Sequence, residues 1–189
     1  MMSFDVAWRR LQTEVVVGRR AVAAVGVAAT VACVALAAQA RIYLPFTPVP
    51  ITLQTFFVLV AGAALGPRLG TVALSTYLVL GTVGLPLFTG QWLGPTTGYL
   101  VGFVAAGWVV GALVRRVERP SLARLAGAMA VGSVVIYALG VLWLMMIGLG
   151  PAEALMAGVV PFLLGDAVKL VAAAAFCRAY RGRLRQLFP

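Results

Sequence analysis

The sequence of 189 residues contains no histidine, only two cysteines, one lysine and five acidic residues. Without histidine there is no Ser-His or Cys-His pair for nucleophilic catalysis, and Asp166 is the only acid inside an apolar run, so paired carboxylates are absent too. Cys33 and Cys177 alone do not make a metal site, and we expect no disulfide between them. A glycine-rich loop followed by Lys-Ser or Lys-Thr is also missing, which excludes ATP hydrolysis by this chain. We therefore predict that the protein is not an enzyme.

Long apolar runs dominate what is present. Hydrophobic residues make up 62% of the chain and the mean hydropathy is +1.03, values typical of an integral membrane protein. We predict an all-α membrane protein with one membrane domain of six transmembrane helices, several of them shorter than the ~20 residues of a full crossing. The six predicted spans cover residues 21–40, 51–66, 69–88, 97–114, 122–148 and 162–180.

The net charge of +10 is concentrated on one side of these spans. Thirteen of the fifteen basic residues lie before span 1, between spans 2 and 3, between or just inside spans 4 and 5, and after span 6. Only Arg41 lies on the other side, and Lys169 lies inside span 6. The positive-inside rule then places both termini in the cytoplasm. The basic surplus is a topology signal, with anionic lipid headgroups as secondary partners, and nucleic-acid binding is not expected.

The N-terminal region combines a charged segment with a small-residue stripe. Residues 1–20 mix arginines with apolar residues and predict a short amphipathic segment on the cytoplasmic face. Ala38-Gln39-Ala40 resembles a signal-peptide cleavage site, but the apolar run before it exceeds the usual ~7–15-residue signal core, so we expect it to be retained as span 1. Within it, Ala24, Ala28 and Ala32 recur at every fourth residue. Small residues at this spacing let a neighbouring helix approach closely.

Proline distinguishes the segment between the first two spans. Pro45, Pro48 and Pro50 lie within six positions, and each restricts the preceding residue to extended geometry. We predict a stiff, nearly polyproline connection on the external side over residues 41–50. Because it is unusually apolar for a solvated loop, we expect it to pack over the helices as a lid.

Three Leu-Gly-Pro triplets occur at residues 65–67, 93–95 and 149–151. Glycine commonly ends a helix, and proline commonly opens the segment that follows. The spacings of the triplets are unequal and their flanks differ. They therefore predict helix boundaries and not an internal repeat.

Two further external segments are predicted. Residues 84–99 are uncharged and rich in glycine and aromatic residues. Trp92 is typical of an interfacial belt. Hydrogen bonds to a ligand can come from Gln91, Thr96, Thr97 and Tyr99. Residues 151–160 are preceded by a helix boundary and end before a proline, so they predict a short external helix ahead of span 6.

The strongest chemical signal is the pair formed by Asp166 and Lys169, which lie three residues apart in span 6. On a helix this spacing places both side chains on one face, and a charge in lipid costs at least a few kcal/mol. The pair is either part of a site for a small polar ligand or an ion pair that merely lets the helix insert. The three external segments emerge on the same side as the pair, which favours the ligand site, with Phe46, Tyr99 and Trp92 enclosing the apolar part of the ligand.

Two motifs are specific enough to indicate a family. They are Ile-Tyr-Leu-Pro-Phe-Thr-Pro-Val-Pro-Ile-Thr-Leu-Gln-Thr at residues 42–55 and Pro-Phe-Leu-Leu-Gly-Asp-Ala-Val-Lys at residues 161–169, with weaker matches at 84–86 and 94–99. In this order, over essentially the whole chain, they resemble the BioY family, the biotin-specific S components of energy-coupling-factor (ECF) importers. The resemblance implies a six-helix S-component fold in the bacterial cytoplasmic membrane, with biotin held near the external surface and no cofactor.

The same resemblance implies partners and residue roles. The partners are a transmembrane T component and paired ABC-type ATPases, and the alanine stripe resembles the face by which S components dock to the T component. Thr97-Gly98 stands where the family pattern has paired glycines. By the resemblance, Asp166 and Lys169 bind the polar groups of biotin, and Arg41 matches the external basic position. From their placement in the chain, Gln54, Tyr99 and Thr97 are predicted to join the binding site. Two alternatives remain open: a self-sufficient secondary carrier of biotin or another vitamin, in which the charged pair is a proton-sensitive gate, and a membrane scaffold without a ligand.

Overall fold

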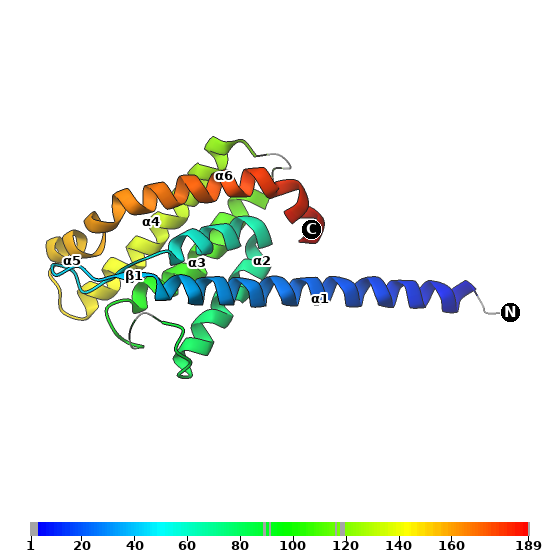
Figure 1. Cartoon of the computed structure of the whole chain (residues 1–189), viewed down its shortest axis with the longest axis horizontal. Helices are drawn as coiled ribbons and strands as arrows, with labels where there is room; N and C mark the ends of the chain where they lie inside the picture. Colours follow the sequence, from blue (N-terminus) through cyan, green and yellow to red (C-terminus); the bar gives the residue numbers. More distant parts are fainter. Residues whose placement is uncertain (1–3, 89, 91, 116, 118–119, 189) are drawn as a thin grey trace.

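The computed structural model describes the backbone of residues 4–88, 90, 92–115, 117 and 120–188, and the side chains of these from residue 18 onward except 181 and 185–187. This part of the chain is almost entirely helical (Figure 1), because a helix satisfies its own backbone hydrogen bonds where lipid cannot. In order, the elements are α1 (Phe4–Gln39), β1 (Arg41–Ile42), β2 (Ile51–Thr52), α2 (Gln54–Thr82), α3 (Thr97–Arg115), α4 (Leu122–Met146), α5 (Pro151–Gly158), the 3₁₀ helix η1 (Val160–Phe162) and α6 (Leu163–Leu187).

Five helical stretches of the described chain are long and apolar enough to cross a membrane, and one of them, α2, is folded back on itself. The helix bends at Gly66, whose φ of 77° and ψ of −179° are not helical, just before Pro67. Nε2 of Gln54, at the start of the first arm, donates to Oη of Tyr77, near the end of the second, at 2.8 Å. The two arms are therefore antiparallel. They correspond to the second and third predicted spans, and the first Leu-Gly-Pro triplet marks the bend.

The first helix differs from its predicted boundaries. α1 is a single helix of 36 residues, and its N-terminal part projects well beyond the bundle (Figure 1). The structure thus joins residues 4–20 to the first span without a break, where the sequence predicted a separate segment. Gly18 alone does not interrupt the helix, because one glycine costs only about 1 kcal/mol relative to alanine. The side chains of residues 1–17 lie outside the described ones, so the amphipathic, surface-bound character of this region stays a prediction.

α3 lies between α2 and α4 and packs closely against both. A Cβ atom at Gly98 or Gly102 would meet the backbone of α4, and one at Gly111 would meet the backbone of the α2 bend. The absence of side chains at these positions lets the helix axes approach, as small residues commonly do in membrane bundles. This close packing fixes the walls of the cavity described below.

The segment between α1 and α2 is a short β-hairpin, where the sequence predicted a nearly polyproline connection. β1 and β2 pair antiparallel, with Arg41 opposite Thr52 and Ile42 opposite Ile51. The prediction was wrong about the ends of this segment, because the extended residues on either side of the prolines pair with each other as β-strands. We call residues 43–50, which connect the two strands, the lid loop.

The lid loop packs against α5. The Thr47 hydroxyl is buried and donates to the carbonyl oxygen of Ala157 at 2.6 Å, and the amide of Val49 donates back to the same hydroxyl at 3.1 Å. Val49 is buried as well, whereas Phe46 is 66% exposed. The lid loop is therefore fixed by the Thr47 hydrogen bond to α5 and by the burial of Val49, and it presents only part of its apolar surface to the bundle.

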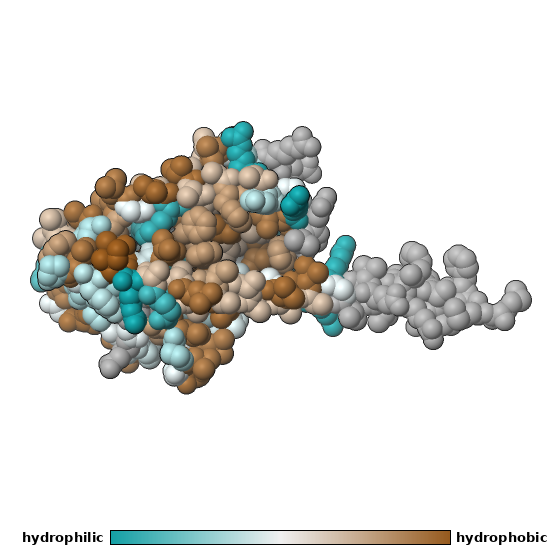
Figure 2. All heavy atoms as spheres, viewed as in Figure 1, coloured by the Kyte–Doolittle hydropathy of each residue, from teal (hydrophilic) through white to brown (hydrophobic). Residues whose placement is uncertain are grey.

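The two ends of the bundle differ in what they carry. α5 and the strand β1 lie at one end, while the C-terminus and the projecting part of α1 lie at the other (Figure 1). The surface between them is mostly hydrophobic, with hydrophilic residues in a few scattered groups (Figure 2). Both termini are thus at the same end of a multi-pass membrane protein; the side of the membrane that they face stays a prediction.

Candidate ligand-binding site

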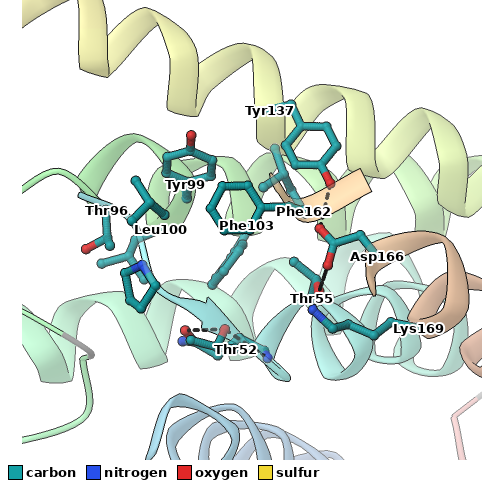
Figure 3. Close-up of a pocket in the computed structure, with 14 residues that line it drawn as sticks. Thr52, Thr55, Thr96, Tyr99, Leu100, Phe103, Tyr137, Phe162, Asp166 and Lys169 are labelled. Atoms are coloured by element: carbon teal, nitrogen blue, oxygen red, sulfur yellow. Dashed lines mark hydrogen bonds and ion pairs between the residues drawn. The ribbon is translucent and has the colours of Figure 1, made fainter. Parts of the chain in front are cut away.

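A small cavity lies at the lid end of the bundle, with about 50 Å³ of free space. Its floor and walls come from α2, α3, α4 and α6, and the lid loop and β2 close it (Figure 3). Most of the lining surface is apolar, and the charged pair with its hydrogen-bond partners lies on the side of α6, away from Thr52 and Thr96 (Figure 3). The lining residues are Val49, Pro50, Thr52, Gln54, Thr55, Thr96, Tyr99, Leu100, Phe103, Ile136, Tyr137, Phe162, Asp166 and Lys169.

The polar centre of the cavity is the carboxylate of Asp166. The Tyr137 hydroxyl of α4 donates to Oδ2 at 2.7 Å, and the Thr55 hydroxyl of α2 donates to Oδ1 at 3.1 Å. Nζ of Lys169 lies 2.7 Å from the same Oδ1. Figure 3 shows these side chains converging from three helices. Each carboxylate oxygen has at least one donor, as a carboxylate withdrawn from water requires.

The position of the pair follows from the start of α6. The helix begins at Leu163, so Asp166 lies in its first turn, where the helix dipole favours a negative charge, and Lys169 lies on the same face one turn later. The two side chains are only 11% and 12% exposed, respectively. They face the cavity and not the acyl chains. Asp166 and Lys169 therefore form the intrahelical ion pair, and both side chains line the cavity.

Gln54 and Tyr99 also line the cavity, but their polar atoms are already occupied. Gln54 is 3% exposed; its amide nitrogen donates to Tyr77, and its carbonyl oxygen accepts from Thr52 at 3.1 Å. The Tyr99 hydroxyl points away from the cavity and donates to the carbonyl of Gly158 at 2.7 Å. Both residues thus shape the site, and Tyr99 offers a ring surface where the sequence suggested a hydrogen bond.

Thr97 and Arg41 do not line the cavity. Thr97 is 2% exposed, and its hydroxyl oxygen has no hydrogen-bond partner among the described residues; the neighbouring Thr96 lines the cavity in its place. Arg41 is exposed on β1, at the outer edge of the hairpin. The predicted site thus brings together four of its six residues.

Two of the three aromatic residues expected to enclose a ligand also lie elsewhere. Phe46 and Trp92 are 66% and 38% exposed and do not line the cavity. The apolar walls come instead from Leu100, Phe103 and Phe162, which are all buried. Helical residues provide these walls because the lid loop turns both of its aromatic side chains, Tyr43 and Phe46, outward.

Thr55 and Tyr137, which hold the carboxylate, were not among the site residues predicted from the sequence. Thr55 directly follows Gln54 inside the first specific motif, so its neighbourhood was a usable signal. Tyr137 lies near the middle of α4, where its hydroxyl needs a hydrogen-bond partner away from water. A polar group at that depth indicates an interior partner, although the sequence does not say which one.

The alanine stripe lies on the outer face of α1. Ala24, Ala28 and Ala32 are all exposed, together with Val25 and Leu36 at 67% and 72% exposure. Within the described part of the chain, the rest of the bundle packs on the opposite face of the helix. The stripe is thus accessible to a neighbouring helix.

Comparisons with known proteins agree on one family. A sequence model of the BioY family matches residues 11–186. The biotin transporter BioY of Thermotoga maritima is 40% identical over 141 residues, covering 71% of this chain and 82% of that protein. The probable biotin transporter BioY of Pyrococcus horikoshii is 37% identical over 149 residues, covering 76% and 87%.

A solved structure gives the fold. The crystal structure of the S component for biotin from an ECF-type ABC transporter matches with a TM-score of 0.78 at 22% identity, over 100% of both chains. At this identity the likeness concerns the fold alone, and it shows that the chain has the S-component fold predicted from the sequence. The matching helices include those that surround the cavity.

Proposed function

The chain belongs to the BioY family, and from this membership we propose that it is the biotin-binding S component of an ECF-type importer. In this proposal it captures biotin in the cavity at the lid end and passes it inward together with a T component and ATPase subunits. One observation of the chain itself carries the proposal: a carboxylate held by donors from three helices, and the ammonium group paired with it, face a largely apolar cavity. Such a site suits a small ligand with both polar and apolar parts.

The chemistry of the cavity matches that of biotin. Biotin has a ureido ring with two N–H donors and a carbonyl, an apolar bicycle and a carboxylate tail. The carboxylate of Asp166 accepts N–H donors, and the ammonium of Lys169 binds a carbonyl or carboxylate oxygen. The rings of Tyr99 and Phe103 provide apolar surface for the bicycle. Each ligand group thus has a partner of the right type among the lining residues.

Biotin entry requires a change in the lid. Pockets for ligands of drug-like size measure about 300–1,000 Å³, whereas the free space here is about 50 Å³. The lid loop covers the cavity and belongs to no helix, with Thr47 tied to α5 and its ends joined by the two-residue strands. We therefore assign to it the movement that admits and then covers biotin.

The remaining parts of the proposal concern orientation and partners. The positive-inside pattern and the common end of the two termini (Figure 1) support a cytoplasmic location for both termini, which puts the cavity at the external face of the cytoplasmic membrane. The exposed stripe of Ala24, Ala28 and Ala32 is the surface that we assign to the T component. Small residues there allow the close helix contact that membrane partners use.

Calorimetric titration of the purified protein with biotin tests the proposal. We expect saturable binding, and we expect Asp166→Asn and Lys169→Ala each to weaken it by more than tenfold, or about 1.4 kcal/mol. Glu153→Gln on α5 and Arg178→Ala on α6 are matched controls, because both residues are exposed and outside the cavity. If the wild-type protein does not bind biotin but binds another vitamin, the cavity would remain a ligand-binding site and biotin would be refuted as its ligand.

Uptake by proteoliposomes separates the importer subunit from the self-sufficient carrier. We expect biotin uptake to require the ATPase and T subunits together with ATP. Uptake by the chain alone that follows an imposed proton gradient would favour the carrier, with the Asp166–Lys169 pair as its gate. Binding without uptake under either condition would leave the capture role intact and would show that a partner is missing.

A further inference from the structure

A second hollow lies at the bend of α2, away from the ligand cavity. It holds about 340 Å³ of free space and is lined by residues 63–69, Gly111, Arg115 and Phe188. The first arm of α2, residues 54–65, runs from the cavity to this hollow, a distance of about 18 Å at 1.5 Å per residue. Phe188, which directly follows α6, lines the hollow, so the hollow lies at the end of the bundle where α6 ends (Figure 1).

The described side chains that line the hollow carry positive charge. Arg68 and Arg115 both line it and are exposed. Among the described residues neither guanidinium makes an ion pair or hydrogen bond, and no described lining residue is acidic. Two guanidinium groups that converge on one hollow attract a group with several negative oxygens, because each offers a planar fork of donors.

Apolar side chains form part of the remaining lining. Leu65, Leu69 and Phe188 contribute hydrophobic walls, and Leu65 is largely buried. α3 supports the bend directly, since a side chain at Gly111 would collide with the backbone at Pro67. The hollow thus places two arginines beside apolar side chains at the end of membrane-crossing helices, where lipid headgroups are found.

We propose that this hollow binds the phosphate group of an anionic phospholipid, with Arg68 and Arg115 on the phosphate and an acyl chain against the apolar wall. Basic pockets between transmembrane helices are suited to such headgroups. The combination of charge and apolar lining favours a lipid over free phosphate, which has nothing to place against Leu65 and Phe188. The site is separate from the ligand cavity and does not depend on what that cavity binds.

Native mass spectrometry of the protein with phosphatidylglycerol, cardiolipin or phosphatidylcholine tests the proposal. We expect the anionic lipids to be retained preferentially and the double variant Arg68→Gln/Arg115→Gln to lose roughly tenfold or more in their affinity. The control Arg178→Gln/Arg183→Gln removes the same charge from exposed positions on α6 and should retain them. If the wild-type protein retains phosphatidylcholine as well as it retains the anionic lipids, the proposal is refuted. This comparison does not depend on any variant.

Further outcomes distinguish other occupants. An equal loss in the control variant would point to general surface charge and overturn the site. Inorganic phosphate that displaces the lipid, or stabilises the protein as well as the lipid does, would assign the hollow to a free anion. A double variant that keeps its lipids but no longer assembles with the ATPase module would assign the two arginines to acidic groups of a partner protein. Biotin binding by the double variant should be unchanged.

Discussion

Replacing Tyr137 with phenylalanine is expected to weaken biotin binding about tenfold while leaving the fold intact. The Tyr137 hydroxyl donates to Oδ2 of Asp166 at 2.7 Å, and no other described residue donates to that oxygen. Thr55 and Lys169 both act on Oδ1. Without the hydroxyl, the carboxylate can rotate about its remaining contacts and no longer presents a fixed oxygen to the ligand. We therefore describe Tyr137 as a positioning residue.

The magnitude follows from the strength of a hydrogen bond to a charged group. Such bonds contribute about 1.5–3 kcal/mol, and only the part that differs between free and bound protein enters the dissociation constant. About 1.4 kcal/mol is tenfold in affinity. Thr55→Val should have a smaller effect, because its 3.1 Å bond goes to the oxygen that Lys169 also contacts. Tyr180→Phe, a change at an exposed tyrosine of α6, is the matched control.

A double-mutant cycle measured by calorimetry separates positioning from general packing. If Tyr137 acts through Asp166, the tyrosine substitution should cost almost nothing once Asp166→Asn is present, since the two changes then remove the same interaction. Additive losses would show that Tyr137 acts independently of the carboxylate. Unchanged or tighter binding by Tyr137→Phe alone would refute the reasoning, because the hydroxyl would then compete with biotin for Asp166.

Three further predictions address the frame of the site. Gly98→Ala should lower the free energy of unfolding by about 1–3 kcal/mol through overpacking against α4. Gly127→Ala, in open space on α4, should leave this free energy unchanged or raise it by up to about 1 kcal/mol. Equal shifts in melting temperature for the two variants would contradict the packing argument. Thr47→Val should speed biotin release about fivefold in stopped-flow measurements by breaking the 2.6 Å bond between lid loop and α5, and an unaltered off-rate would exclude the lid assignment. Ala28→Trp should preserve biotin binding but prevent co-purification with the ATPase module; assembly at wild-type yield would remove α1 as the docking face.

The charged pair was predictable because the sequence has so few charges to choose from. Asp166 and Lys169 stand alone in an apolar run, and helical spacing settles that they share a face. The partners of the carboxylate were not predictable in the same way. Tyr137 is 29 residues from Asp166 and Thr55 is 111 residues away, so their contacts depend on how three helices pack. A single sequence contains no direct signal for that packing.

The bend inside α2 and the β-hairpin before α2 also differ in how far the local sequence predicts them. Glycine followed by proline at residues 66–67 marked a helix boundary correctly, because glycine takes a positive φ there and proline opens the second arm. The β-hairpin before α2 was missed. Polyproline and β conformations occupy neighbouring parts of the same extended region, and they differ mainly in whether a partner strand is present. Local residue preferences give the extended geometry but not the pairing of Arg41 with Thr52.

The cost of burying charge argues that the Asp166–Lys169 pair does more than ease membrane insertion. A buried ion pair is often no more stabilising than apolar residues of similar size, so insertion alone would be served better by leucine or methionine at both positions. It would also not require a tyrosine of α4 and a threonine of α2 to complete the hydrogen bonds of the carboxylate. In this chain the pair faces an apolar cavity instead of lipid. Its mutual contact keeps both charges neutralised while the cavity is closed, and it leaves a donor and an acceptor in place for a ligand that separates them.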